Sequence, residues 1–83
     1  MDITPQVLLV LDEVLSLNGR TSQFTRDTHL LGAIPELDSM AVVNVITALE
    51  EHFGISVADD EIGAATFATL GSLSAFVEQK LDA

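Results

Sequence analysis

The sequence predicts an all-α fold, a small bundle of three main helices and one short helix, with a long loop between the first two main helices. Apolar residues recur at helical spacing in three segments, and residues typical of helix starts and ends bound each of them. No segment has the alternating pattern of a β-hairpin. The chain has 83 residues, 48% apolar and 19% charged. This composition is typical of a folded globular protein, and the length predicts one domain over residues 1–83.

The first helix is expected to begin at Thr4-Pro5 and to end at Asn18-Gly19. A threonine side chain can accept hydrogen bonds from the free amides of a helix start, and proline is tolerated at the first helical position. Asn-Gly is typical of a helix end. Five apolar side chains share one face: Val7, Leu8, Leu11, Val14 and Leu15. The helix should therefore bury one side along about four turns.

Residues 20–37 have no sustained periodicity and indicate a long loop. Apolar side chains along it should anchor it to the core: Phe24, Leu30, Leu31, Ile34 and Leu37. We expect Arg20 and Arg26 to tie the loop to nearby acids. A loop of this length in a compact domain is usually functional, and we expect that here.

The remaining helices are also bounded by start and end signals. The second should begin at Asp38-Ser39, where a carboxylate at the cap favours the positive end of the helix dipole, and end at Gly54. A short helix is expected from Asp59 to about Ala65. The last helix should begin between Thr69 and Ser72. It should bury an apolar stripe, with Phe76 at its edge: Leu70, Leu73, Val77 and Leu81.

The charge of the chain excludes several classes of function. Three Lys+Arg against 13 Asp+Glu give a net charge of -10. The basic residues are too few and too scattered to bind phosphate backbones or anionic lipid, so we expect basic protein partners and no nucleic acid. The longest apolar run, Val7–Leu11, is far shorter than the ~20 residues of a spanning helix, and Asp2 without a basic region argues against a signal peptide. We expect a cytoplasmic monomer without membrane insertion.

The length and the composition of the chain argue against catalytic and metal sites. A chain this short leaves little room for both a core and a catalytic cleft, so we expect no enzyme activity of its own. It has no cysteine, hence no thiolate nucleophile and no Cys-based metal site. The acidic run 59–61 suggests a solvated helix cap, with partner contact or loose cation binding as the alternative. An EF-hand is disfavoured, because it would need a glutamate where Leu70 stands. His29 and His52 lack partners at metal spacing, and His52 is expected at a helix end.

The second helix has two apolar faces. Its core stripe spans about 100° of arc and consists of Val42, Val45, Ile46, Leu49 and Phe53. The opposite face carries two apolar residues among polar and acidic ones, which are the predicted partner-binding residues: Met40, Val43, Asn44, Thr47, Glu50 and Glu51. This pattern favours a docking surface with an adaptable methionine. Two exposed apolar side chains are also normal on a small protein.

Ser39 has three interpretations. A serine at a helix start is most often a cap without chemistry. A catalytic role is disfavoured, because the segment 37–41 lacks the glycines of a nucleophile elbow and His52 lies about 20 Å further along the helix. A hydroxyl at a helix N-terminus beside the Asp38 carboxylate also suits attachment of a phosphate-linked group, since helix N-termini stabilise phosphate anions.

At these residues the chain resembles the acyl carrier protein family. The segment Leu37-Asp38-Ser39-Met40 is close to the family's Asp-Ser-Leu signature. The likeness covers essentially the whole chain, with further matching segments at Asp27–Gly32, Val43, Leu49–Glu51, Phe53–Ile55 and Leu70–Leu73.

The resemblance implies that 4'-phosphopantetheine is attached covalently to Ser39. A separate Mg²⁺-dependent holo-carrier synthase, a phosphopantetheinyl transferase, would supply it from coenzyme A, with Asp38 assisting. The resemblance also implies a carrier that holds acyl groups as thioesters on the arm's thiol, which a chain without cysteine must import. An acyl-loading ligase and acyltransferase-type enzymes would be further partners. Their basic patches would grip Glu50 and Glu51, while Met40 and Val43 would supply apolar contacts.

The chain also departs from the family pattern. Fatty-acid carriers usually have acids where Ala41, Asn44 and His52 stand, so this face is less negative and general fatty acid biosynthesis is disfavoured. The lead-in Gly32–Leu37 is more similar to stand-alone carriers of surface-polymer or exosortase-linked clusters. The pathway therefore stays open between lipid, polyketide and surface polymer. An aminoacyl or peptidyl carrier is an alternative, although the usual Gly-Gly pair before the serine is absent. An acidic helical interaction module without prosthetic group is another.

Overall fold

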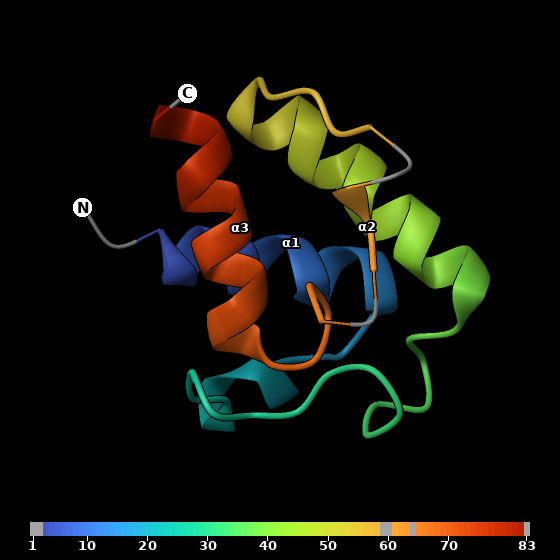
Figure 1. The fold of residues 1–83 in the computed structure, drawn as a ribbon. Coiled ribbons are helices and arrows are strands. Elements are labelled where there is room, and N and C mark those ends of the chain that lie inside the picture. Colours follow the sequence, from blue (N-terminus) through green and yellow to red (C-terminus); the bar gives the residue numbers. More distant parts are fainter. Residues whose placement is uncertain (1–2, 59–60, 64, 83) are drawn as a thin grey trace.

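The computed structural model describes residues 3–58, 61–63 and 65–82, which form a helical bundle (Figure 1). Its elements are α1 (Thr4–Leu15), the short 3-10 helix η1 (Arg20–Gln23), α2 (Ser39–Phe53) and α3 (Leu70–Asp82). Across these residues there is no β-strand, and the predicted all-α fold with a long loop between the first two main helices is confirmed. No helix within the described ranges has the length and apolar character needed to cross a membrane.

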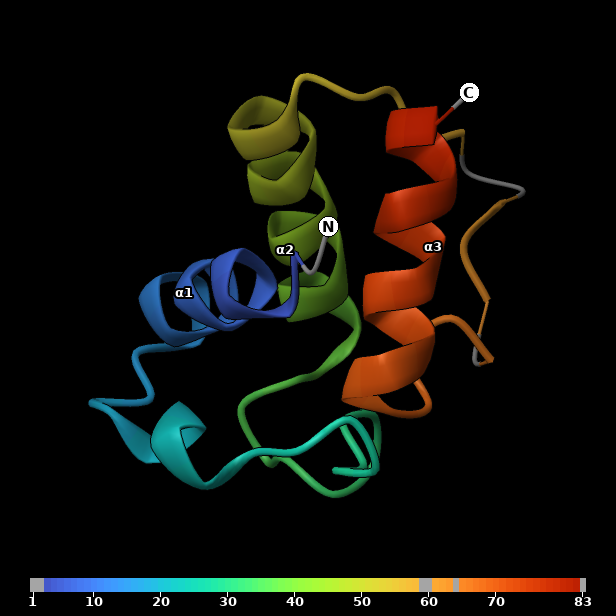
Figure 2. The same ribbon diagram turned by 90° about the vertical axis from the view of Figure 1, so that its left-hand side faces the viewer.

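The three helices do not run side by side as a simple up-and-down bundle. α2 and α3 point in the same direction, and α1 lies across them (Figures 1 and 2). The N-terminal ends of α2 and α3 therefore share one end of the molecule, where the loop 16–38 also lies. All three helices and the loop contribute to the core: Ile3, Val7, Val10, Leu11, Leu15, Leu17, Leu30, Ile34, Leu37, Val45, Ile46, Leu49, Phe67, Leu70, Leu73 and Val77.

The predicted end of the first helix is wrong. α1 ends at Leu15, where Ser16 adopts the left-handed conformation with φ 54° and donates its N–H to the Asp12 carbonyl. The helix thus stops before Asn18-Gly19. In a continued helix Leu17 would lie roughly 20° from the buried Val10 around the axis, at the edge of the buried stripe. Leu17 also enters the core after the turn at Ser16, where it is 1% exposed.

The predicted capping role of Thr4 at the start of α1 is also wrong. Ile3 occupies the cap position and makes no side-chain cap hydrogen bond. The Thr4 hydroxyl is buried and donates to Ser74 Oγ at 3.4 Å, while it accepts from Arg26 Nη1 at 3.1 Å. Thr4 therefore joins α1 to α3 and to the loop.

The loop is held against the segment 65–71 that leads into α3. Four backbone hydrogen bonds of 2.8–3.0 Å join them: Leu30 N to Ala68 O, Leu31 N to Phe67 O, Leu70 N to Thr28 O and Gly71 N to Arg26 O. The anchors Leu30, Ile34 and Leu37 are buried and Phe24 is partly buried, as predicted. Leu31 is 41% exposed and is not an anchor. Leu31 is the first residue of the turn 31–33 that follows Leu30, and its side chain is exposed there while that of Leu30 is buried.

Gly71 lies where a side chain has no room. A Cβ there would sit 2.9 Å from the Arg26 carbonyl oxygen, which already accepts the Gly71 N–H at 2.8 Å. We expect Gly71→Ala to lower the free energy of unfolding, measured by urea denaturation, by up to about 2 kcal/mol. Overpacking of about 1–3 kcal/mol outweighs the ~1 kcal/mol gain in helix propensity. At Gly63 a Cβ would meet nothing within 4 Å, so Gly63→Ala should change little. A stabilised Gly71→Ala variant would contradict this account.

α3 begins where the sequence predicted. Ser72 N donates to Thr69 Oγ1 at 3.1 Å and Thr69 N to Ser72 Oγ at 3.0 Å, a reciprocal cap in which serine replaces the usual glutamate. The stripe residues Leu70, Leu73 and Val77 are buried, whereas Leu81, in the last turn beyond the end of the core, is 38% exposed.

The predicted short helix falls partly on residues 59, 60 and 64, which lie outside the described residues. Ile62 and Gly63 are not helical. Glu61 N donates to Ala58 O at 3.0 Å, and Ala58 N donates to Glu61 Oε1 at 2.9 Å.

Candidate functional site

Ser39 is the exposed first residue of α2, and Asp38 is the cap. Asp38 Oδ1 accepts from Ala41 N at 2.8 Å, and its carbonyl accepts from Val42 N at 2.9 Å. The predicted helix start is therefore confirmed. Asp38 takes the capping role at this helix start by accepting the Ala41 amide. The Ser39 hydroxyl makes no hydrogen bond to any described residue.

Two backbone amides complete the site. The N–H groups of Ser39 and Met40 precede the first hydrogen-bonded turn and make no hydrogen bond within the described ranges. They carry the partial positive charge of a helix N-terminus, which favours an adjacent phosphate. An exposed hydroxyl beside two uncommitted amides thus fits a phosphodiester at Ser39.

The chain entering this site is fixed by an ion pair. Arg20 donates to the Glu36 carboxylate and, through Nε, to Leu17 O at 3.2 Å. The predicted tie between Arg20 and a loop acid is confirmed. The hydrogen bond from Arg20 lowers the pKa of the Glu36 carboxyl below its ordinary value. A carboxylate with a lowered pKa stabilises the fold above its unfolded pKa, and this contribution is lost as the pH falls through the folded value.

The exposed face predicted on α2 is present. Met40 is 75% exposed and Val43 61%, and Asn44, Thr47 and Glu51 are also exposed. Thr47 Oγ1 donates to Val43 O at 3.0 Å, which keeps the hydroxyl on its own helix. On the opposite face the core stripe is as predicted, with three residues buried and two partly buried: Val45, Ile46 and Leu49, then Val42 and Phe53. Partner contact at the exposed face stays a prediction.

Glu50 differs from the other predicted partner-binding residues. It is partly buried, and its Oε2 accepts from Val57 N at 2.8 Å. No pattern in the sequence indicates this contact, because Val57 lies seven residues further on, in an irregular segment whose path is set by tertiary packing.

The remaining polar candidates have structural partners. His52 lies exposed in the last turn of α2, as predicted, with its ring edge-on to Phe53 at 4.8 Å between centroids. Glu61 pairs with Lys80, whose ammonium also lies 5.9 Å from the Phe76 ring centre. The hydrogen bond from Lys80 lowers the pKa of Glu61. Asp59 and Asp60, the other members of the acidic run, lie outside the described residues.

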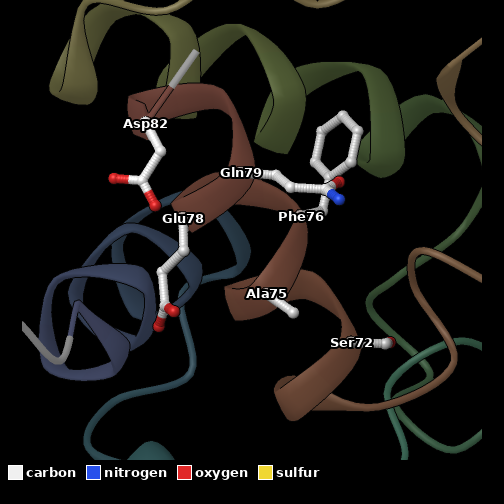
Figure 3. Close-up of a pocket in the computed structure, with 6 residues that line it drawn as sticks. All are labelled: Ser72, Ala75, Phe76, Glu78, Gln79 and Asp82. Atoms are coloured by element: carbon white, nitrogen blue, oxygen red, sulfur yellow. The ribbon is translucent and has the colours of Figure 1, made fainter.

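An open hollow runs along α3 (Figure 3). It is lined by Ser72, Ala75, Phe76, Glu78, Gln79 and Asp82, all from this one helix. Its hydroxyl, Ser72 Oγ, donates to Thr66 O and Thr69 O at 2.9 Å each. With that serine committed to the backbone, the hollow presents no activated nucleophile, and the exposed hydroxyl of Ser39 is the better candidate for chemistry.

Comparisons with known proteins agree with the helical fold. Residues 9–77 match the family described as "Phosphopantetheine attachment site". Among solved structures, the chain is similar to the holo acyl carrier protein of Nitrosomonas europaea, determined by solution NMR. The two are 59% identical over 100% of both chains, with a TM-score of 0.93. A comparison with curated proteins finds no match.

The chain belongs to the acyl carrier protein family. The members of this family carry covalently attached 4'-phosphopantetheine and act as carriers, not as catalysts. They interact with phosphopantetheinyl transferases and with enzymes that process acyl groups.

Proposed function

We propose that Ser39 carries the 4'-phosphopantetheine arm and that the protein delivers acyl groups, as thioesters on this arm, between enzymes of a lipid, polyketide or surface-polymer pathway. The observation that carries the proposal is the exposed, unbonded Ser39 hydroxyl at the start of α2, inside the family match over residues 9–77. The arm supplies the thiol that the cysteine-free chain lacks.

The proposed attachment is a phosphoryl transfer to Ser39. Its Oγ forms a bond to the phosphorus that bears the pantetheine arm of coenzyme A. The bond from that phosphorus to the bridging oxygen breaks, and adenosine 3',5'-bisphosphate leaves. The serine proton passes to a base of the transferase. The amides of Ser39 and Met40 then face the phosphodiester and stabilise its charge.

We propose that Asp38 has two roles, one in the fold and one in modification. Oδ1 caps α2, while Oδ2 makes no hydrogen bond to described residues and is free to meet the Mg²⁺ of the transferase. Asp38→Ala should lower the free energy of unfolding by about 1 kcal/mol, whereas Asp38→Asn keeps an acceptor and should lose only a few tenths. Both variants should be modified slowly, because both lack the charge. Urea denaturation and a modification time course measure the two effects. Modification of Asp38→Asn at the wild-type rate would show that Asp38 acts only as the cap of α2.

The exposed face of α2 is the proposed docking surface for the transferase, the loading ligase and acyltransferase-type enzymes. Met40 and Val43 offer apolar contact beside the attachment site, and the net charge of -10 attracts basic surfaces over long range. Asn44 and Thr47 lie within the same exposed stripe and would make neutral contacts.

The test is incubation of the purified protein with coenzyme A and a promiscuous phosphopantetheinyl transferase. Intact mass spectrometry should show one added phosphopantetheine, and fragmentation of the modified peptide should locate it at Ser39. A reaction without transferase is the control. No mass increase, or an added group on another residue, would overturn the proposal.

A further inference from the structure

Glu50 and Glu51 are neighbours in the sequence but lie in different surroundings. Glu51 is exposed and, eleven residues after Met40, projects within about 20° of it around the helix axis. Glu50 is partly buried and projects about 80° from Met40. The two carboxylates therefore do not face the same partner surface.

Glu50 binds the segment that leaves α2. Its carboxylate accepts from Val57 N at 2.8 Å, and its carbonyl accepts from the amides of Gly54 and Ile55. One residue thus receives three N–H groups of the segment 54–57. Ile55 and Val57 pack against the core, so these bonds fix where two apolar side chains cover it.

We propose that Glu50 is a positioning residue that holds the segment 54–57 on α2, and that Glu51 alone of the pair is the acid that a basic side chain of a partner contacts. The second half rests on the proposed function, since it takes α2 as the docking face. The sequence-based prediction assigned both acids to partner contact, whereas the geometry favours a different role for each.

The two carboxylates differ in the free energy that pairing with a partner's basic side chain would cost. The Glu50 carboxylate already has a charge-assisted hydrogen bond, so pairing with a partner would either break that bond or desolvate the group further. Glu51 has no such bond within the described residues. As an exposed charge it can meet a cation at small cost, with a correspondingly modest gain.

Three variants separate the roles: Glu50→Gln, Glu50→Ala and Glu51→Gln. The two glutamine variants remove the same unit of charge, so they alter long-range attraction equally. Glutamine at position 50 can still accept from Val57 N, whereas alanine cannot. We expect Glu51→Gln to raise the KM of the transferase for the protein by about twofold to fivefold, the range of an exposed ion pair. Glu50→Gln should change that KM only by the small long-range effect that the two glutamine variants share.

Amide hydrogen exchange by NMR provides a readout independent of the transferase. In Glu50→Ala we expect the Val57 amide to exchange about tenfold faster, as loss of a hydrogen bond to a charged group allows. The Leu49 amide, in the helix core, should be unchanged. Equal KM increases for Glu50→Gln and Glu51→Gln, an unchanged KM for Glu51→Gln, or unaltered Val57 exchange would each overturn the division. If wild type is not modified at all, the proposed function fails, and Val57 exchange still decides the positioning role.

Discussion

Ser39→Ala is expected to abolish the mass increase on incubation with coenzyme A and transferase, because no other atom at the start of α2 can form the phosphodiester. Its effect on stability should be small. Asp38, not Ser39, caps the helix, so the free energy of unfolding should change by less than the ~1 kcal/mol of a lost cap. A complete loss of modification in a fully folded variant separates attachment from capping.

Ser56→Ala is the matched control for that experiment. Ser56 is also exposed and makes no hydrogen bond to described residues, but it lies outside a helix start. Its removal should leave both modification and unfolding unchanged. Modification of Ser39→Ala at the wild-type rate would rule out Ser39 as the attachment residue. A loss of stability near 1 kcal/mol without loss of modification would restore the cap interpretation.

Phe67→Ala is expected to be the most destabilising single change described here. Phe67 is 1% exposed in the irregular segment before α3, and its carbonyl accepts the Leu31 amide at 3.0 Å. Truncating a buried phenylalanine costs about 3–5 kcal/mol, and each kcal/mol shifts the midpoint of a domain of this size by about 4–8 °C. Thermal denaturation followed by circular dichroism should therefore show a midpoint lower by more than roughly 12 °C.

Leu9→Ala provides the comparison for Phe67→Ala. Leu9 is an apolar residue of α1, but it is 57% exposed. Its truncation should change the unfolding free energy by no more than about 0.5 kcal/mol, as for most surface changes. Comparable midpoints for the two variants would show that the segment 65–71 does not hold the loop to the core.

Local signals were sufficient to predict most of the helices, and they also led to Ser39 as the proposed attachment residue. The cap at Asp38, the stop at Gly54 and the start near Thr69 act through hydrogen bonds within a few residues, so they can be predicted from short segments. The position of Ser39 at the start of α2 was predicted in the same way, and its proposed chemistry depends on that position. The end of α1 was missed because the left-handed residue that ends it is Ser16, where the sequence has neither the glycine nor the asparagine typical of that position.

The sequence by itself determined an acidic, cysteine-free, all-α chain with Ser39 at a helix start and Met40 and Val43 on an exposed face. Composition and helical periodicity are properties of the residues alone, and they do not depend on how the helices are arranged in space. Only the tertiary structure decided that the loop pairs with the segment 65–71, that Gly71 must lack a side chain beside Arg26, and that Glu50 turns to Val57. Each of these depends on atoms brought together by the packing of α1 across α2 and α3, which periodicity within one segment cannot specify.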